Sequence, residues 1–164
     1  MGLQHKSGML LTVVLLYSAL GAAEPRAVIT VATDDTAVQV EAGADGLALA
    51  ALKGLSADHD WLQSKAVQQF VQAAELDGQS TPLRWQFKRS ESQDGPPRRR
   101  ILVFVNERPP LELHSIWQAE PGPGPVEHSL LIRNTGTSPV LLPWQGSLVF
   151  ARPGESLQTN AGWR

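Results

Sequence analysis

The sequence contains no cysteine, so neither a disulfide framework nor a lipid-attachment cysteine can stabilise or anchor the protein. It also lacks an Asn-x-Ser/Thr glycosylation acceptor, because Asn106, Asn134 and Asn160 have no hydroxyl residue two positions later. Both absences suit a bacterial envelope better than a eukaryotic secretory pathway. The formal net charge of only −2 argues against binding to nucleic acid or other polyanions.

Motifs of catalytic chemistry are missing as well. The chain has no Gly-x-Ser-x-Gly elbow, no His-Glu-x-x-His motif, no phosphate-binding glycine loop and no dinucleotide fingerprint. Hydrolysis by paired carboxylates needs two acids roughly 5 to 10 Å apart, and the spacing of Asp and Glu marks out no such pair. Asp58, His59 and Asp60 are adjacent, but neighbouring side chains on a strand point in opposite directions. We therefore expect no catalytic residue, metal site or cofactor, and no activity from this chain alone.

The start of the chain has the pattern of a secretory signal. His5 and Lys6 give a polar, positive start, residues 9–20 form an apolar run, and three small residues follow. The run is shorter than the roughly 20 residues of a membrane-spanning helix. We predict that residues 1–23 are a signal peptide and that residues 24–164 are exported, to the periplasm or outside the cell, without stable membrane insertion. The alternative is an uncleaved membrane anchor.

Short β-prone runs between turn residues organise the remainder. Asp-Gly pairs at residues 45–46, 77–78 and 94–95 predict turns between neighbouring strands, because glycine accepts positive φ. The clearest strand is residues 83–88, where apolar and polar side chains alternate. Further strands are predicted over residues 27–33, 36–41, 100–105, 111–118, 126–133, 139–142 and 146–150. We therefore predict an all-β fold class: one antiparallel β-sandwich over residues 24–164, which we expect to be incomplete at its C-terminal end.

Residues 58–76 fit two structures. An aspartate cap and an apolar stripe through Trp61, Ala66 and Phe70 favour a short helix or an irregular crossover. The same letters permit two strands. We predict the helix or crossover, followed by a strand that enters the second Asp-Gly turn.

Two further segments bear on the layers of the sandwich. Residues 101–105 are apolar on both faces, which predicts a central strand between two layers. Residues 121–125 (PGPGP) predict a stiff connector that brings the strands of His114 and His128 into one sheet. Because no third ligand stands near either histidine, we interpret both as hydrogen-bonded or surface residues.

The exported part has five tryptophans and four phenylalanines but no tyrosine, since the single tyrosine lies in the signal segment. Indole rings stack on the apolar face of sugar rings. Trp85 and Trp117 lie in alternating strands, so we interpret them as core residues. Trp144 and Trp163 follow proline and glycine in loop-like contexts, and we predict that these two contact carbohydrate.

From Leu83 onward the order of segments resembles the N-terminal β-domain of melibiase-type alpha-galactosidases, glycoside hydrolase family 36. The segments are LRWQF at 83–87, RRILVF at 99–104, PLELHSIWQA at 110–119, PGPGPVEH at 121–128, LIRN at 131–134, PVLL at 139–142 and SL at 147–148. The resemblance implies a supersandwich placed before a (β/α)₈ barrel, whose two aspartates hydrolyse alpha-galactosides with retention. None of that barrel is in this chain, so no catalytic residue is carried over.

We therefore expect the noncatalytic front domain of an exported alpha-galactosidase-like enzyme, truncated before the barrel. Its expected partners are the barrel and a galactoside. The alternative is a free-standing exported module that binds carbohydrate or protein, and a third hypothesis is a structural adhesion or assembly module. Oligomerisation is left open.

Overall fold

A computed structural model describes residues 25–56, 59–62, 64–143 and 145, and these residues form strands and turns without a helix. The strands are β1 (Ala27–Ala32), β2 (Thr36–Gly43), β3 (Gly46–Gly54), β4 (His59–Asp60), β5 (Ala66–Gln68), β6 (Ala73–Leu76), β7 (Gln79–Pro82), β8 (Gln86–Gln93), β9 (Arg98–Asn106), β10 (Leu111–Ala119) and β11 (Val126–Asn134). The predicted all-β fold class is confirmed. No helix in these ranges is long and apolar enough to cross a membrane.

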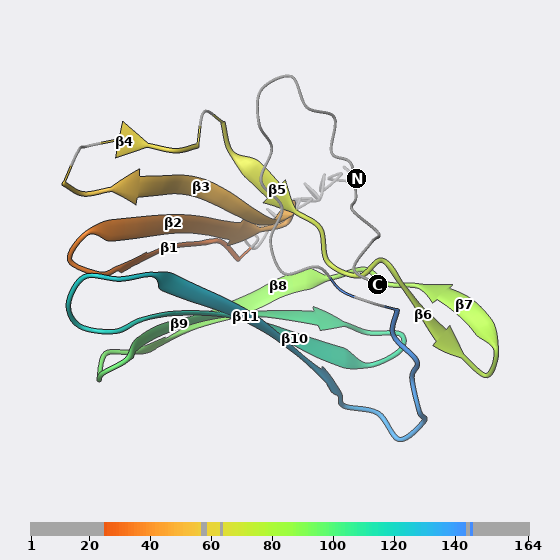
Figure 1. Ribbon diagram of the computed structural model, residues 1–164. Helices are drawn as coiled ribbons and strands as arrows, with labels where there is room; N and C mark the ends of the chain where they lie inside the picture. The colour runs from red at the N-terminus through yellow and green to blue at the C-terminus, as the bar shows by residue number, and fades with distance from the viewer. Residues whose placement is uncertain (1–24, 57–58, 63, 144, 146–164) are drawn as a thin grey trace, which may run out of the picture.

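Two antiparallel sheets lie face to face as a sandwich (Figure 1). The first, here called the upper sheet, has the order β1-β2-β3-β4, and β5 pairs with the other end of β3. The second, the lower sheet, has the order β11-β10-β9-β8. Strands β1 and β2 contact strands of the lower sheet, and the β6–β7 hairpin lies beside the sandwich.

The three Asp-Gly pairs occupy turns between neighbouring strands, as predicted. Asp45-Gly46 closes β2 onto β3, with Gly43 opposite Gly46, and Asp94-Gly95 lies between β8 and β9. In the β6–β7 turn, Asp77 has φ 50° and Gly78 has φ 76°. Two successive positive φ angles are the requirement of a tight hairpin turn, which aspartate tolerates and glycine meets without steric cost.

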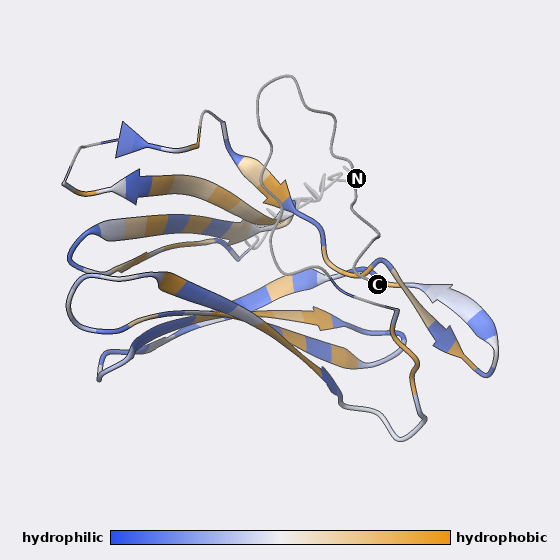
Figure 2. Cartoon of the chain, viewed as in Figure 1, coloured by the Kyte–Doolittle hydropathy of each residue, from blue (hydrophilic) through white to orange (hydrophobic). Residues whose placement is uncertain are grey.

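The core lies between the two sheets and follows from alternation along the strands (Figure 2). Every second residue of the central strands points inward, so apolar side chains collect on one face of each sheet. The largest inward-facing residues are Val40, Leu47, Leu49, Phe87, Leu102, Phe104, Leu113 and Trp117. Phe104 contacts Phe70 and Phe87, with ring centroids 4.9 and 5.5 Å away. The sandwich is therefore held by one apolar layer with aromatic contacts at its centre.

The helix option for residues 58–76 is wrong, because the described part of this segment contains β4, β5 and β6, but β6 is the predicted strand that enters the Asp77-Gly78 turn. Ala66 and Gln68 are buried while Val67 between them is exposed, which is the alternation of a strand. Strand β5 pairs with β3, placing Ala66 opposite Leu49. Pairing with the sheet outweighs the helix propensity of the Gln-, Lys- and Ala-rich sequence.

Other boundaries differ from the sequence prediction. Strand β3 was not among the predicted runs, although Leu47 and Leu49 alternate with less buried neighbours. The ladder of β8 begins at Gln86, while the predicted inward-facing residues Leu83 and Phe87 are buried. Residues 139–142 form no strand and contribute one bridge, from Leu141 to Glu75. The strand predicted at 146–150 lies outside the described residues.

Leu102 and Leu131 provide a matched test of the core, because both are leucines of the lower sheet. Leu102 is fully buried, whereas Leu131 is 46% exposed. We expect Leu102→Ala to lower the free energy of unfolding by about 2 to 5 kcal/mol, since it leaves a cavity. Leu131→Ala should cost less than about 1 kcal/mol. Chemical denaturation measures both values, and equal losses would contradict this assignment of the core.

Candidate functional site

An apolar stripe runs along the face of the lower sheet that points away from the upper sheet. Leu102 and Phe104 belong to the core, so the residues that alternate with them on β9 lie on the outer face. The same alternation on β10 and β11 places further apolar residues beside them. The apolar stripe consists of Ile101, Val103, Val105, Ile116 and Leu131. Leu131 is exposed, Val103 is buried and the other three are half-buried.

A charged network crosses this stripe from β8 to β10. Arg89 contacts Glu91 at 2.7 Å and Glu112 at 3.8 Å, and Glu112 is 2.6 Å from His114 Nε2. Since Val103 pairs with Arg89 on one side and with His114 on the other, the network passes over β9 at Val103. The hydrogen bond with His114 is the main cause that holds the pKa of the Glu112 carboxyl below its usual range.

Polar side chains also border one end of the stripe. Arg99 Nε donates to Gln118 Oε1 at 3.0 Å, and Gln118 Nε2 donates to a carboxylate oxygen of Glu127. These contacts join β9, β10 and β11 on the outer face. The outer face therefore carries apolar side chains on either side of a charged network, with further polar groups at one end, and such a mixed surface occurs at protein interfaces.

Ser115 and His128 form a polar pair inside the sandwich. Ser115 is fully buried, and its Oγ lies 3.0 Å from His128 Nε2. Trp117 Nε1 donates to the same oxygen at 2.9 Å. A serine beside a histidine can be an activated nucleophile. A serine with no exposed surface cannot meet a substrate, so this pair satisfies polar groups within the core.

Burial governs the protonation of His128. Its ring lies against Trp117, with centroids 4.2 Å apart, and burial lowers the pKa of the imidazole from 6.5 to about 4. His128 Nδ1 is buried and makes no hydrogen bond to any described residue. The imidazole is therefore neutral at pH 7, and the Ser115 hydroxyl can donate to its Nε2.

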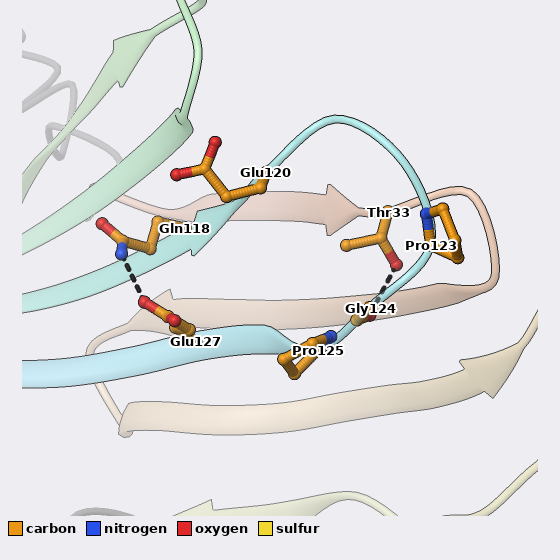
Figure 3. A pocket seen from close by; sticks show the side chains of 7 residues that line it. All are labelled: Thr33, Gln118, Glu120, Pro123, Gly124, Pro125 and Glu127. Carbon is orange, nitrogen blue, oxygen red and sulfur yellow. Dashed lines mark hydrogen bonds between the residues drawn. The ribbon is translucent and has the colours of Figure 1, made fainter.

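A small hollow lies where the β1–β2 turn meets the PGPGP connector (Figure 3). Its volume is ≈ 90 Å³, which holds about three waters. Ligand pockets for drug-sized molecules begin at about 300 Å³. The hollow is lined by Thr33, Gln118, Glu120, Pro123, Gly124, Pro125 and Glu127. Its size excludes an enclosed sugar site.

The side chains around this hollow join the two sheets. Asp35 Oδ1 accepts the Gly124 N–H at 3.0 Å and the Thr33 hydroxyl at 2.9 Å. The hydrogen bond from Gly124 is the main cause that lowers the pKa of the Asp35 carboxyl. Asp34 N also donates to Gly122 O at 2.9 Å. These bonds clamp the turn of the upper sheet to the connector of the lower sheet.

The sequence-predicted carbohydrate residues Trp144 and Trp163 lie outside the described residues. The interpretation of Trp117 as a core residue is confirmed, since it is 2% exposed. Trp85 packs against the core and is half-buried, and its indole N–H donates to Val71 O at 2.8 Å. Trp61, predicted from the sequence to lie on the apolar stripe of a helix, is instead 54% exposed.

The Asp60 carboxylate binds backbone N–H groups on either side of β4. Asp60 Oδ1 accepts the N–H groups of Leu62 at 3.0 Å and of Leu52 at 3.2 Å. The first of these bonds is the main cause that lowers the pKa of the carboxyl. Asp58 lies outside the described residues, and within the described ranges no three His, Asp or Glu side chains are grouped to hold a metal ion.

The stability of the protein should fall as the pH drops from 6.5 towards 4, because of His128. Between these values the unfolded chain binds a proton at this position and the folded chain does not. The free energy of unfolding then decreases by at most about 1.4 kcal/mol per pH unit, and by less where solvent screens the ring. Urea denaturation at pH 5 and pH 7 measures the difference.

A pair of histidine variants isolates the effect. His128→Gln should make the free energy of unfolding less dependent on pH. His59→Gln, at an exposed histidine, leaves His128 in place and should not change the pH dependence of the free energy of unfolding. The lowered pKa values of the Glu112 and Asp35 carboxyls also make stability fall at acid pH, but both histidine variants keep these carboxyls, so the comparison cancels their contribution. Equal slopes for the original chain and His128→Gln would refute the assignment.

Comparison with known proteins gives no relative. No family model, no curated protein and no solved structure matches the chain. The resemblance to melibiase-type alpha-galactosidases therefore stays a prediction from the sequence.

Proposed function

We propose that this chain is the noncatalytic front domain of an exported alpha-galactosidase-like glycoside hydrolase, and that its apolar stripe packs against the catalytic barrel. The observation that carries the proposal is the outer face of the lower sheet, where half-buried and exposed apolar side chains have charged neighbours. The order of segments from Leu83 onward supports the choice of this family.

The composition of β9 favours a covering layer on both sides of the lower sheet. A strand with one solvated face normally alternates apolar and polar residues, whereas a strand covered on both faces is continuously apolar. Residues 101–105 of β9 are continuously apolar, and the upper sheet covers only one of their faces. The barrel is the proposed cover for the other face.

The charged border would give such a contact its orientation. Arg89 and Arg99 lie beside Glu112 and Glu127 on the outer face, so both signs are present around the stripe. Complementary charges on a partner fix the register of docking more than its strength. In this proposal the domain covers one side of the barrel and helps to shape its sugar entrance.

The genomic reading frame beyond the codon for Arg164 allows a direct test. If that frame encodes a (β/α)₈ barrel, the two-domain protein can be produced with Leu131→Glu or Ile116→Glu. Each substitution would bury an unpaired charge between the domains. The free energy of the domain contact would then be weaker by about 2 kcal/mol or more. We expect faster proteolytic separation of the domains and lower alpha-galactosidase activity.

Val28→Glu is the matched control, since Val28 is 62% exposed on the outer face of the upper sheet. This variant should keep both the domain contact and the activity. A stop codon directly after Arg164 in the genome, or equal behaviour of Leu131→Glu and Val28→Glu, would exclude the proposed domain.

The exposed indole of Trp61 favours a second candidate, a free-standing exported module that binds carbohydrate. In that case the apolar stripe needs no barrel, and the isolated sandwich should melt as one cooperative unit.

A further inference from the structure

The backbone around Trp61 is fixed to the upper sheet. Trp61 N donates to Leu52 O at 2.8 Å. The carboxylate of the preceding residue, Asp60, accepts the N–H groups of Leu52 and Leu62 on either side. The indole therefore projects from a backbone segment that is bonded to β3 at Leu52 and held by a local hydrogen bond between Leu62 and Asp60.

Gly54 forms the floor beneath the indole. A Cβ at Gly54 would lie 3.2 Å from Trp61 Cζ2 and 3.5 Å from Cη2, so the ring packs directly on the glycine. The ring of His59 meets the indole at 65°, with centroids 6.4 Å apart. With these contacts Trp61 is still 54% exposed. The indole is thus a supported, flat apolar surface that is open to solvent.

One side of the β3–β4 ladder carries both the indole and the His59 ring. Lys53 pairs with Asp60 across β3 and β4, and Gly54 pairs with His59. Because neighbouring residues of a strand point to opposite faces, His59 lies on the same side as Gly54 and Trp61, whereas Lys53 and Asp60 lie on the other side. The imidazole is therefore the polar group beside the indole.

Sugar rings are recognised by this combination of groups. Their C–H faces stack on an indole, while their hydroxyls exchange hydrogen bonds with nearby polar side chains. A surface that is fixed before binding loses little conformational entropy when it is used. An open platform also accepts one ring of a long chain, which an enclosed pocket of ≈ 90 Å³ cannot.

We propose that Trp61 is the platform of a carbohydrate-binding site, on which a neutral hexopyranose ring of a polysaccharide stacks, with His59 as its polar neighbour. The site gives a ligand to the second candidate function and is also compatible with the first. Strand β4 lies at the edge of the upper sheet, whereas the apolar stripe lies on the outer face of the lower sheet (Figure 1).

Affinity electrophoresis of the full exported chain in gels that contain galactomannan or β-glucan tests the site. We expect retardation in at least one gel. Trp61→Ala should weaken binding about tenfold, which corresponds to about 1.4 kcal/mol and lies within the range of aromatic stacking. Gly54→Ala should weaken it in the same direction, because the added methyl displaces the ring. Trp61→Phe should restore part of the retardation that Trp61→Ala removes.

Val28→Ala is the control, since it also removes an exposed apolar side chain of the upper sheet, but from β1 rather than from the β3–β4 edge. It should bind as the original chain does, and thermal melting followed by circular dichroism shows that each variant is folded. No retardation in either gel, or unchanged retardation of folded Trp61→Ala, overturns the proposal. Neither result bears on whether Leu131→Glu speeds the proteolytic separation of the two domains. The carbohydrate site and the proposed barrel contact can therefore be refuted independently of each other.

Discussion

The apolar contact between the two sheets is the constraint on which the rest of the molecule depends. Because the chain has no cysteine, no disulfide bond joins one sheet to the other. Leu102 and Phe104 of β9 are fully buried in the shared core, together with Val40 and Leu49 of the upper sheet. The strands that carry the apolar stripe and Trp61 belong to the two sheets that form this core. The positions of these surface side chains therefore depend on how well the two sheets pack. The hydrogen bonds of Asp35 to Thr33 and Gly124 add a polar connection at one end, where the turn of one sheet meets the connector of the other.

The two proposed surfaces use the sandwich in different ways. The apolar stripe lies on a broad sheet face together with polar and charged side chains. Such a face suits contact with another folded domain. Trp61 is a single supported ring at a sheet edge, which suits one unit of an extended ligand. Between them lies a core that contains a serine and a histidine, and their contact with Trp117 serves packing and polar satisfaction rather than chemistry. A sandwich can therefore hold a partner on one side and a ligand on the other without a conformational change.

The sequence predicted most of the lower sheet, since strict alternation and Asp-Gly turns are local signals that need no knowledge of distant residues. It failed where local signals conflict with pairing. Strand β3 is rich in alanine and leucine, which favour helices, and only its place between β2 and β4 makes it a strand. Residues 66–68 were predicted as part of a helix or crossover for the same reason. Their pairing with β3 makes them a strand, and this pairing cannot be read from the local sequence. Trp61 was placed on the apolar stripe of the predicted helix, because no sequence pattern shows that it packs on Gly54 instead. The predicted contacts of Trp144 and Trp163 lie outside the described residues and stay predictions.

The order of the sheets along the chain has a consequence for biogenesis. All strands of the upper sheet precede those of the lower sheet in sequence, from β1 at Ala27 to β11 at Asn134. A chain that emerges from the ribosome N-terminus first therefore completes the upper sheet while the lower sheet is still being synthesised. During that interval Val40, Leu47 and Leu49 have no opposing layer and face water. Uncovered sheets of this kind associate readily with one another, so the half-emerged chain is the stage at which a holding chaperone would matter most.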